Sequence, residues 1–407
     1  MLSDEVIEKV TERLVTRIEE ANTFILKKIG EDIAKLRKLT PSQARELIQI
    51  LRYGGDYDKM VKKLAEVTRL NVNDIYDIFE EVAKNDYNFA KQFYDYKGKK
   101  FIPYEKNTAL KKQINALARI TAGEYVNLMN TSSIGFTTTD INGKSVFKKL
   151  SDSYIKILDE AVLNVSQGKE SFDSALRKSL KQFGQSGLKT LDYESGRSVR
   201  LDSAVRMNIK GALRSLHNEM QQQLGEEFDA DGVEISVHTN PAPDHAEVQG
   251  HQFSKEEFEK FQNDQDAVDY NGVLFTADYN GRDRRAISEY NCYHYIFSIV
   301  LGVNKPQYDQ EKLQQIIDDN NKGFDLDGKH YTNYEGTQLQ RNLERKIREQ
   351  KDIQIMARQS GDNELVDNCQ KNIRHLTIKY NELSKTSGLP TKLQRMSVSG
   401  YKRVKTT

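Results

Sequence analysis

The chain has 407 residues, of which 37% are hydrophobic and 30% are charged, and its mean hydropathy is −0.72. This length predicts two or three structural units. The polar composition excludes a membrane-embedded protein and one large compact core, whereas the hydrophobic content exceeds that of a disordered chain. We therefore expect a mainly α fold that is elongated and has a large surface per residue.

Charge and cysteine content narrow the class of protein further. The 61 basic and 60 acidic residues nearly balance, so no overall field attracts the chain to nucleic acid. Two cysteines are too few for a disulfide scaffold and suit a reducing compartment. The N-terminal MLSDEVIEKV is acidic where a secretion signal is basic, and the longest strongly apolar stretch, 296–303, is too short to span a membrane. These features predict a soluble protein made in the cytoplasm.

Apolar positions spaced three or four residues apart predict helices along most of the first 225 residues. The Thr- and Ser-rich segment 131–145 interrupts them; its Asn142-Gly143 pair suits a type I′ turn, so either a β-hairpin or a loop is expected. A helix break is expected at Asn71. The predicted helices cover residues 3–36, 41–51, 57–69, 72–96, 107–129, 146–165, 171–183 and 198–224.

The pattern changes from residue 226 onward, where a small α+β unit is predicted. Residues 233–237 alternate between apolar and polar side chains, which is typical of a short, half-buried strand. A short helix at 254–262 and two apolar stretches, 270–275 and 295–300, follow; the second stretch fits a strand or a helix. Beyond this unit, the sequence DLDG at 325–328 predicts a turn, because no glutamate follows at the spacing of an EF-hand.

The C-terminal part is rich in charge. Residues 337–384 predict a long helix, or a helical hairpin broken near Gly361, and their sparse apolar positions predict packing on one partner only. Residues 388–407 contain no acidic side chain, so we expect a solvated tail that could touch DNA or an acidic partner. Its candidate nucleic-acid-binding residues are Lys392, Arg395, Lys402, Arg403 and Lys405.

Five potential metal ligands fall in the α+β unit. Imidazole and thiolate are ligands that zinc prefers, and four of the five would close a tetrahedral structural site. No paired C-x-x-C is present, so the alternative is that the histidines form ordinary hydrogen bonds and the cysteine is a small buried apolar side chain. No cofactor is certain, and structural zinc is the candidate. The five residues are His238, His245, His251, Cys292 and His294.

Catalysis is not expected. The sequence offers Cys292 as a nucleophile, His294 or His245 as a base and Asp244 as an orienting acid. However, no protease signature flanks the cysteine. The sequence has neither a phosphate-binding GxxxxGK[ST] loop nor an HExxH motif. A substrate-sized pocket lined by Cys292 and a paired base would contradict this prediction.

Three arginines, Arg282, Arg284 and Arg285, lie just before residue 288. Three interpretations remain open for them. They could form a solvated loop face, pair with the acidic residues nearby, or contact a phosphate backbone.

Several of these segments resemble a known family. The stretch SVHTNPAPDHAEVQG at 236–250 is similar to the S-x-H-x-x-A-R-P-x-H-x-x-x-Q-G stretch of phage minor capsid proteins. The resemblance is strongest to the minor capsid protein 2 family. That family is related in turn to the Mu F-like head morphogenesis proteins. Residues 192–206, 288–294 and 334–348 resemble further motifs of the family in the same order. Asn240-Pro241 and Tyr293 depart from the family pattern by removing arginines, whereas the family's histidines and cysteine are retained at His238, His245, Cys292 and His294.

The resemblance implies a low-copy virion component of a phage or prophage, located inside the head near the portal and present in the host cytoplasm during assembly. Portal, major capsid and scaffold proteins are the expected partners, packaged DNA is a further candidate, and no membrane is involved during assembly. One alternative is a DNA-associated ejection protein that uses the tail and the arginines; its DNA binding would weaken steeply with salt. The other is an enzyme or toxin-type module that uses Cys292 and the histidines.

Four units are predicted on this basis. Residues 1–225 form a helical body that docks to portal or capsid, and residues 226–305 form the α+β module with the His/Cys cluster. Residues 306–387 form a linker and a charged helix or hairpin, and residues 388–407 form the basic tail.

Overall fold

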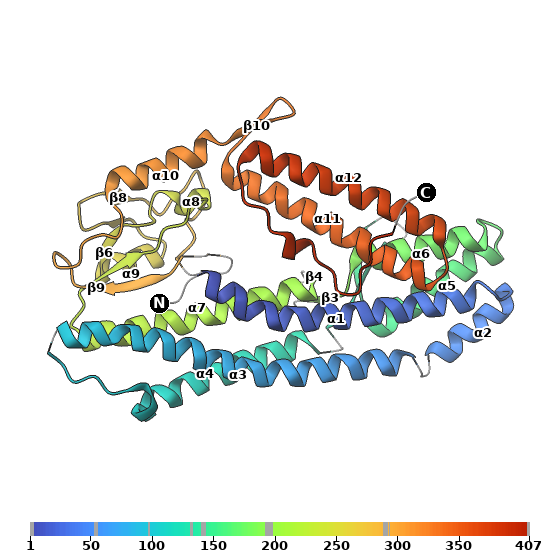
Figure 1. The fold of residues 1–407 in the computed structure, drawn as a ribbon, viewed down its shortest axis with the longest axis horizontal. Helices are drawn as coiled ribbons and strands as arrows, with labels where there is room; N and C mark the ends of the chain where they lie inside the picture. The colour runs from blue at the N-terminus through green and yellow to red at the C-terminus, as the bar shows by residue number, and fades with distance from the viewer. Residues whose placement is uncertain are drawn as a thin grey trace.

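The computed structural model describes residues 4–52, 56–96, 98–130, 133–139, 144–191, 198–287, 292 and 294–404. The fold is mainly helical (65%), with small antiparallel sheets in the middle of the chain and a helical hairpin near the C-terminus, which confirms the predicted fold class (Figure 1). None of the described helices combines the length and the apolar character needed to cross a membrane.

Long helices from the first half of the chain form the body. These are α1 (Asp4–Leu36), α3 (Asp56–Tyr96), α4 (Thr108–Leu128) and α7 (Leu201–Glu227), which lie side by side along the long axis of the molecule (Figure 1). At one end, α2 (Pro41–Arg52), α5 (Leu150–Ser166) and α6 (Phe172–Ser186) pack beside them. The apolar stripes of all these helices join in one continuous hydrophobic core.

The predicted helix break at Asn71 is wrong, because α3 continues through it. The side chain of Asn71 is fully buried, and its amide donates to the carbonyl of Leu14 (3.1 Å) and to the hydroxyl of Tyr125 (2.9 Å). Its carbonyl oxygen accepts a hydrogen bond from Arg17 (3.1 Å). Asparagine disfavours helices by competing for nearby backbone groups. Here the neighbouring helices satisfy it instead.

Strands occupy the starts of two predicted helices. The first pair, β1 (Ile134–Thr139) and β2 (Ser145–Lys149), is antiparallel, which confirms the hairpin alternative; the predicted turn at Asn142-Gly143 lies outside the described residues. The second pair is β3 (Lys189–Leu191) and β4 (Ser198–Arg200). Together they form a sheet in the order β2-β1-β3-β4, so the two helices begin only at Leu150 and Leu201.

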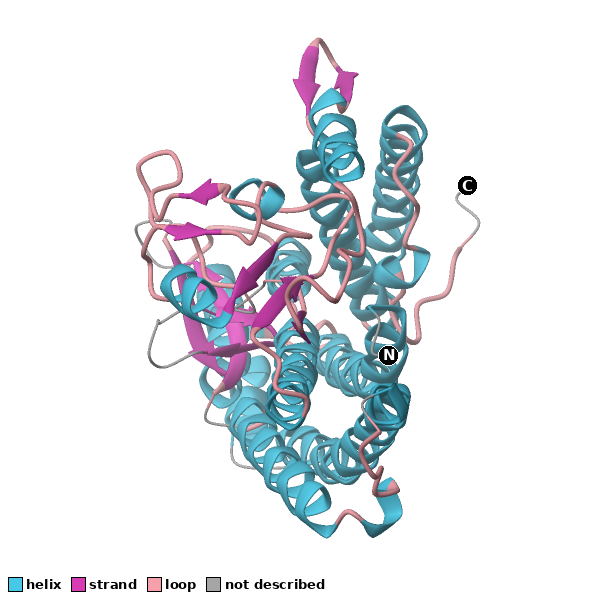
Figure 2. Cartoon of the chain, turned by 90° about the vertical axis from the view of Figure 1, so that its left-hand side faces the viewer, coloured by secondary structure: helices cyan, strands magenta, loops and turns pink. Residues whose placement is uncertain are grey.

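The predicted α+β unit contains a three-stranded antiparallel sheet in the order β6-β5-β9. Its strands are β5 (Gly232–Ile235), β6 (Gln252–Ser254) and β9 (Ile296–Ile299), so the stretch 295–300 is a strand. Helix α8 (Pro243–Ala246), helix α9 (Lys255–Gln262), β7 (Ala267–Val268) and β8 (Leu274–Phe275) complete it. These strands gather at one side of the helices and have a small hydrophobic core of their own (Figure 2).

The C-terminal part begins with α10 (Gln310–Lys322) and the hairpin of β10 (Phe324–Leu326) and β11 (Lys329–Tyr331). Asp327 and Gly328 form the expected turn between these strands, with φ angles of 50° and 76°. Helices α11 (Asn333–Gln359) and α12 (Asn363–Ser387) then form the hairpin, which reverses at Gly361 with a φ angle of 74°. The short 3-10 helices are η1 (Tyr104–Lys106) and η2 (Leu393–Met396).

The prediction that residues 337–384 pack on one partner only is wrong, since α11 contacts α1, α6 and α12. Glycines allow the close approach. A Cβ added to Gly184 would lie 2.3 Å from Cγ1 of Ile353, and one added to Gly30 would lie 2.7 Å from the carbonyl oxygen of Met356. Few large apolar side chains are needed on α11 because the helix backbones meet at these glycines.

The expectation of a solvated tail is wrong for residues 388–404, which fold back over the helices. Met396 and Val398 are buried. The hydroxyl of Thr23 on α1 donates to the carbonyl of Ser399 (2.7 Å), and the amide of Val404 donates to the side chain of Gln370 on α12 (3.0 Å). The tail therefore joins the hairpin to the body.

A buried ion cluster connects β4 and α7 to α11. The guanidinium of Arg200 donates to Asp352 (3.1 Å) and to Asp202 (3.3 Å), and Arg348 donates to the other oxygen of Asp202. Burial raises the pKa of Asp202, but Arg348 and Arg200 outweigh burial, so the net pKa lies below its usual value. Both carboxylates are buried, Asp352 completely.

The close approach at Gly184 predicts a large effect of a small substitution. Gly184→Ala should lower the free energy of unfolding by about 1–3 kcal/mol, because the new methyl group overlaps Ile353. The matched control is Gly123→Ala on α4, where no atom lies within 4 Å of the added carbon, and it should stabilise the protein by about 0.5–1 kcal/mol. Urea unfolding of both variants tests this; equal effects would contradict the packing described.

Glu19 on α1, near the ion cluster, predicts a pH-dependent effect. Burial, with a contribution from Asp202, raises its pKa to about 7. The folded state therefore favours the protonated acid: the stability it contributes is complete below about pH 4.5 and is lost as the pH rises through 7. Glu19→Gln should raise the free energy of unfolding by about 1–3 kcal/mol at pH 8 and leave it unchanged at pH 4. Glu20→Gln, at the exposed neighbouring position, is the control; a gain from Glu19→Gln that is equal at both pH values would exclude titration as its cause.

Candidate functional site

Strand pairing places the ends of two segments together. The ladder of β5 and β9 pairs Ile235 with Ile296 and continues one residue further, where the amide of Ser236 donates to the carbonyl of Tyr295 (2.9 Å). His238, just after β5, and Cys292 and His294, just before β9, therefore lie at the same end of the sheet. The short helix α8, which begins at Pro243, brings His245 to the same place.

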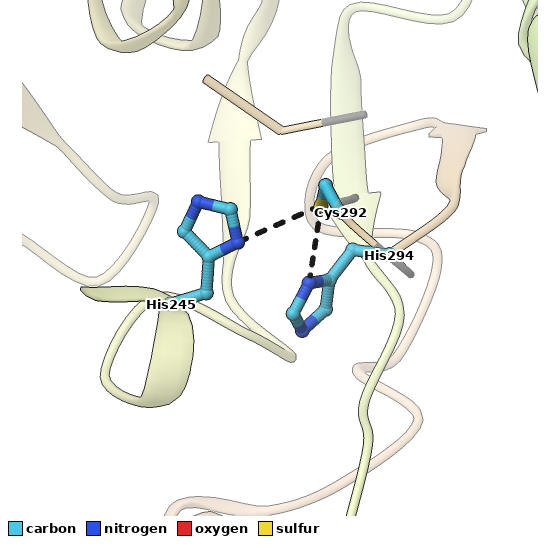
Figure 3. Close-up of side chains that lie close together, drawn as sticks. All are labelled: His245, Cys292 and His294. Atoms are coloured by element: carbon cyan, nitrogen blue, oxygen red, sulfur yellow. Dashed lines mark hydrogen bonds between the residues drawn. The ribbon is translucent and has the colours of Figure 1, made fainter. Parts of the chain in front are cut away.

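Three of the five predicted ligands meet at one point. The Sγ of Cys292 lies 3.5 Å from Nδ1 of His245 and 3.5 Å from Nδ1 of His294 (Figure 3). All three ligand atoms lie within 4.8 Å of one another, and all three side chains are buried. The structure thus assembles a His-Cys-His cluster from residues that are up to 49 positions apart in the sequence.

The other two predicted ligands lie differently. The ring of His238 packs edge-on against His294, with 4.6 Å between ring centroids, and it does not belong to the three-atom cluster. Nδ1 of His251 lies 2.7 Å from a carboxylate oxygen of Asp269, and its ring packs against Phe275. His251 therefore belongs to a separate contact.

Hydrogen bonds fix the orientation of both imidazoles in the cluster. Nε2 of His245 lies 2.8 Å from the carbonyl oxygen of Arg285, which can only accept, so Nε2 carries the proton. The side-chain oxygen of Gln249 accepts from the amide of His238 (2.8 Å) and from Nε2 of His294 (3.2 Å). In both rings Nδ1 is then the nitrogen with the lone pair, and it faces the sulfur.

Burial keeps these imidazoles neutral. It lowers the pKa of His245 below its usual value. Burial, with the neighbouring His238 and His245, lowers the pKa of His294 to about 2. Neutral imidazole is the form that binds metal ions.

Two of the three predicted arginines pair with local acids. Arg285 binds both carboxylate oxygens of Asp244 (2.6 and 2.8 Å). Arg284 is buried, donates to the carbonyl of Asp244 (2.8 Å) and lies 3.5 Å from Glu247. Arg282 is exposed. Pairing with acidic neighbours is thus the interpretation that fits Arg284 and Arg285.

A cavity of about 670 Å³ opens beside the cluster. Its walls come from α1, α7, the α+β module, the first turns of α11 and the segment around η2. Five of its described lining side chains are Lys or Arg and one is Glu, so its walls are mainly basic. The charged lining residues are Glu8, Lys210, Arg285, Arg341, Lys392 and Arg395.

The predicted tail cations separate into two groups. Lys392 and Arg395 line the cavity. Lys402 and Arg403 are exposed, and the carbonyl of Lys402 accepts a hydrogen bond from Arg358 near the end of α11 (3.2 Å). Lys405 lies outside the described residues.

Comparison with known proteins adds the family. A family model described as phage minor capsid protein 2 matches residues 2–383. The chain belongs to this family. Comparisons with curated proteins and with solved structures give no match. The match covers the helical body, the α+β module and nearly all of α12, so it extends the resemblance of the segments between residues 192 and 348 to the N-terminal half.

In this minor capsid protein the cluster could support two kinds of chemistry. Cys292 beside His294, with His294 held by Gln249, has the order of groups found in thiol nucleophiles, and the adjoining cavity is large enough for a substrate. A pocket of this kind, lined by Cys292 and a paired base, would contradict the prediction of a purely structural role. However, an activated thiolate needs a protonated imidazole beside it, and burial opposes that form at His294. Two imidazole nitrogens and one sulfur that converge in a buried site are an arrangement that favours metal binding.

Gln249 and Arg341 were not predicted as site residues. Gln249 lies in the 236–250 stretch that carries the family resemblance, so its position was available as a signal. Arg341 lies about 90 residues further on, and only the docking of α11 brings it to the cavity.

Gln249 predicts a strong local effect. Gln249→Ala should lower the free energy of unfolding by about 2–4 kcal/mol, because it removes the acceptor of the partly buried amide of His238 and of the buried Nε2 of His294. The exposed Gln265→Ala is the control and should change stability by less than about 0.5 kcal/mol. Chemical denaturation measures the stability of both variants. A change for Gln249→Ala no larger than that of the control would refute the role of Gln249 as the shared hydrogen-bond acceptor.

Proposed function

We propose that this minor capsid protein is a low-copy structural component located inside the phage head beside the portal, and that it does not act as an enzyme. The observation that carries the proposal is the family match over residues 2–383, which spans every described helix up to α12. A match confined to the α+β module would also fit a protein of another function that contains the same module. Here the match covers the helical body, the module and nearly all of the C-terminal hairpin.

The helical body offers a surface for a large partner. Ile120 on α4 is 57% exposed, and Ala116 and Gly123, one turn away on either side, are exposed as well. These positions lie on one face of the helix. Ile120 is the most exposed large apolar side chain among the described residues of the body, and such a side chain on a long helix suits contact with a large protein surface. We assign the portal contact to this α4 face, within the proposed docking unit 1–225.

The alternative of a DNA-associated ejection protein has less support. A basic tail that binds DNA must be accessible, but residues 388–404 pack on α1 and α12, and Lys392 and Arg395 line the cavity. Arg284 and Arg285 pair with acidic neighbours. Of the predicted nucleic-acid-binding residues that the structure describes, Arg282, Lys402 and Arg403 remain exposed, which is a small number of phosphate contacts.

Co-expression with the portal protein of the same phage tests the proposal. The chain should copurify with tagged portal and be present in purified heads in far fewer copies than the major capsid protein. Ile120→Asp should abolish copurification, because a charge at the centre of an apolar contact is left without a partner. Leu163→Asp is the matched control, since Leu163 on α5 is 47% exposed but lies elsewhere on the body.

Each result has a definite meaning. Absence of the chain from heads, together with no copurification, would overturn the proposal. Loss of portal binding in Leu163→Asp but not in Ile120→Asp would support the portal association but overturn the assignment of the contact to α4.

A further inference from the structure

We propose that His245, Cys292 and His294 bind one Zn²⁺ through Nδ1, Sγ and Nδ1, and that the fourth coordination position faces the basic cavity. This inference rests on the geometry of the cluster and is independent of the portal contact. The residues come from α8 and from the segment that enters β9, so the ion would link two parts of the α+β module.

Electron-pair counting at the cluster favours a cation. Both Nδ1 atoms present lone pairs to the sulfur, because each Nε2 carries its proton toward a carbonyl oxygen. Two imidazole nitrogens and one sulfur whose lone pairs converge form a ligand set that zinc prefers. A zinc ion in place of the thiol proton satisfies both nitrogens and the thiolate together.

The distances agree with tetrahedral zinc. Bond lengths of about 2.3 Å to sulfur and 2.0–2.1 Å to nitrogen place sulfur and nitrogen about 3.5–3.6 Å apart at a tetrahedral angle. Both Sγ–Nδ1 distances in the structure are 3.5 Å. A tetrahedral ion also needs the two Nδ1 atoms about 3.3–3.4 Å apart, and all three ligand atoms lie within 4.8 Å of one another.

The groups around the ligands also have the arrangement of a metal site. Histidine ligands commonly donate their second ring N–H to a carbonyl or carboxylate oxygen, which fixes the ring. His245 donates to the carbonyl of Arg285, and Arg285 is itself held by Asp244; His294 donates to Gln249. Both rings are thus fixed before any ion binds.

The fourth position is assigned to the cavity. His238 lines the same cavity as the three ligands and its ring packs against His294, but its ring nitrogens are not among the three clustered ligand atoms. Arg341, Lys392 and Arg395 make that cavity basic. An anionic oxygen, such as that of a phosphate group that displaces a water molecule, suits a zinc ion with three protein ligands in these surroundings.

Metal content and thiol protection test the three ligands. The full chain, stripped of metal and given excess zinc, should retain one equivalent after gel filtration, and zinc should slow alkylation of Cys292 at least about tenfold. Cys369, the second cysteine, is buried and serves as the internal reference. Cys292→Ser and His294→Ala should lose the metal, whereas His251→Ala should retain it. The alkylation arm uses the unaltered chain, so misfolding of a variant cannot mimic its result.

Cobalt tests the fourth position. Co²⁺ bound in place of zinc should give a thiolate charge-transfer band that is absent in Cys292→Ser, and inorganic phosphate should change its visible spectrum. His238→Ala should keep the metal. Less than about a tenth of an equivalent of zinc with no protection of Cys292 would overturn the site. Metal loss in His238→Ala, or a spectrum that phosphate leaves unchanged, would overturn the open position.

Discussion

The buried ion cluster of Arg200, Asp202, Arg348 and Asp352 is the interaction on which the rest of the structure depends. It joins the start of α7 to α11 across 146 to 152 positions of sequence. Removing one member leaves a buried charge without its partner, which costs about 3–5 kcal/mol, so the hairpin is held in one register on the body. Because the first turns of α11 form one wall of the cavity, this register also determines which side chains face the His/Cys cluster.

Local sequence patterns predicted most helices of the body but not how the C-terminal hairpin docks. Helical periodicity is a local signal, and it located α1 and the break near Gly361 well. It failed at Asn71, whose side chain is satisfied by α1 and α4, and on α11, where close packing depends on Gly30 and Gly184 of other helices. Both failures have one cause, since the deciding contacts join residues that are far apart in the sequence.

The candidate site was predictable to the extent that its chemistry is local. His245, Cys292 and His294 could be proposed as ligands from residue type, and antiparallel pairing of β5 with β9 brings them together. The sequence could not separate His251 from them, because its partner Asp269 is recognised only from the fold. The cavity was not predictable, since its basic wall combines Lys210 with residues of α11 and the tail.

The cavity lies between the body, the module and the hairpin, so docking of the hairpin is coupled to ligand binding in the cavity. Its walls come from α1, α7, the α+β module, α11 and the segment around η2, so a ligand held there contacts the body, the module and the hairpin together. A ligand that binds only this docked arrangement stabilises it, by about 2.7 kcal/mol at a hundredfold excess over its dissociation constant. By the same linkage, docking of the hairpin increases affinity for the ligand. The module has a small hydrophobic core of its own, so an ion bridging α8 and the entry to β9 would stabilise one cavity wall directly. A structural role in the head and a binding cavity are therefore compatible, because the same contacts produce both.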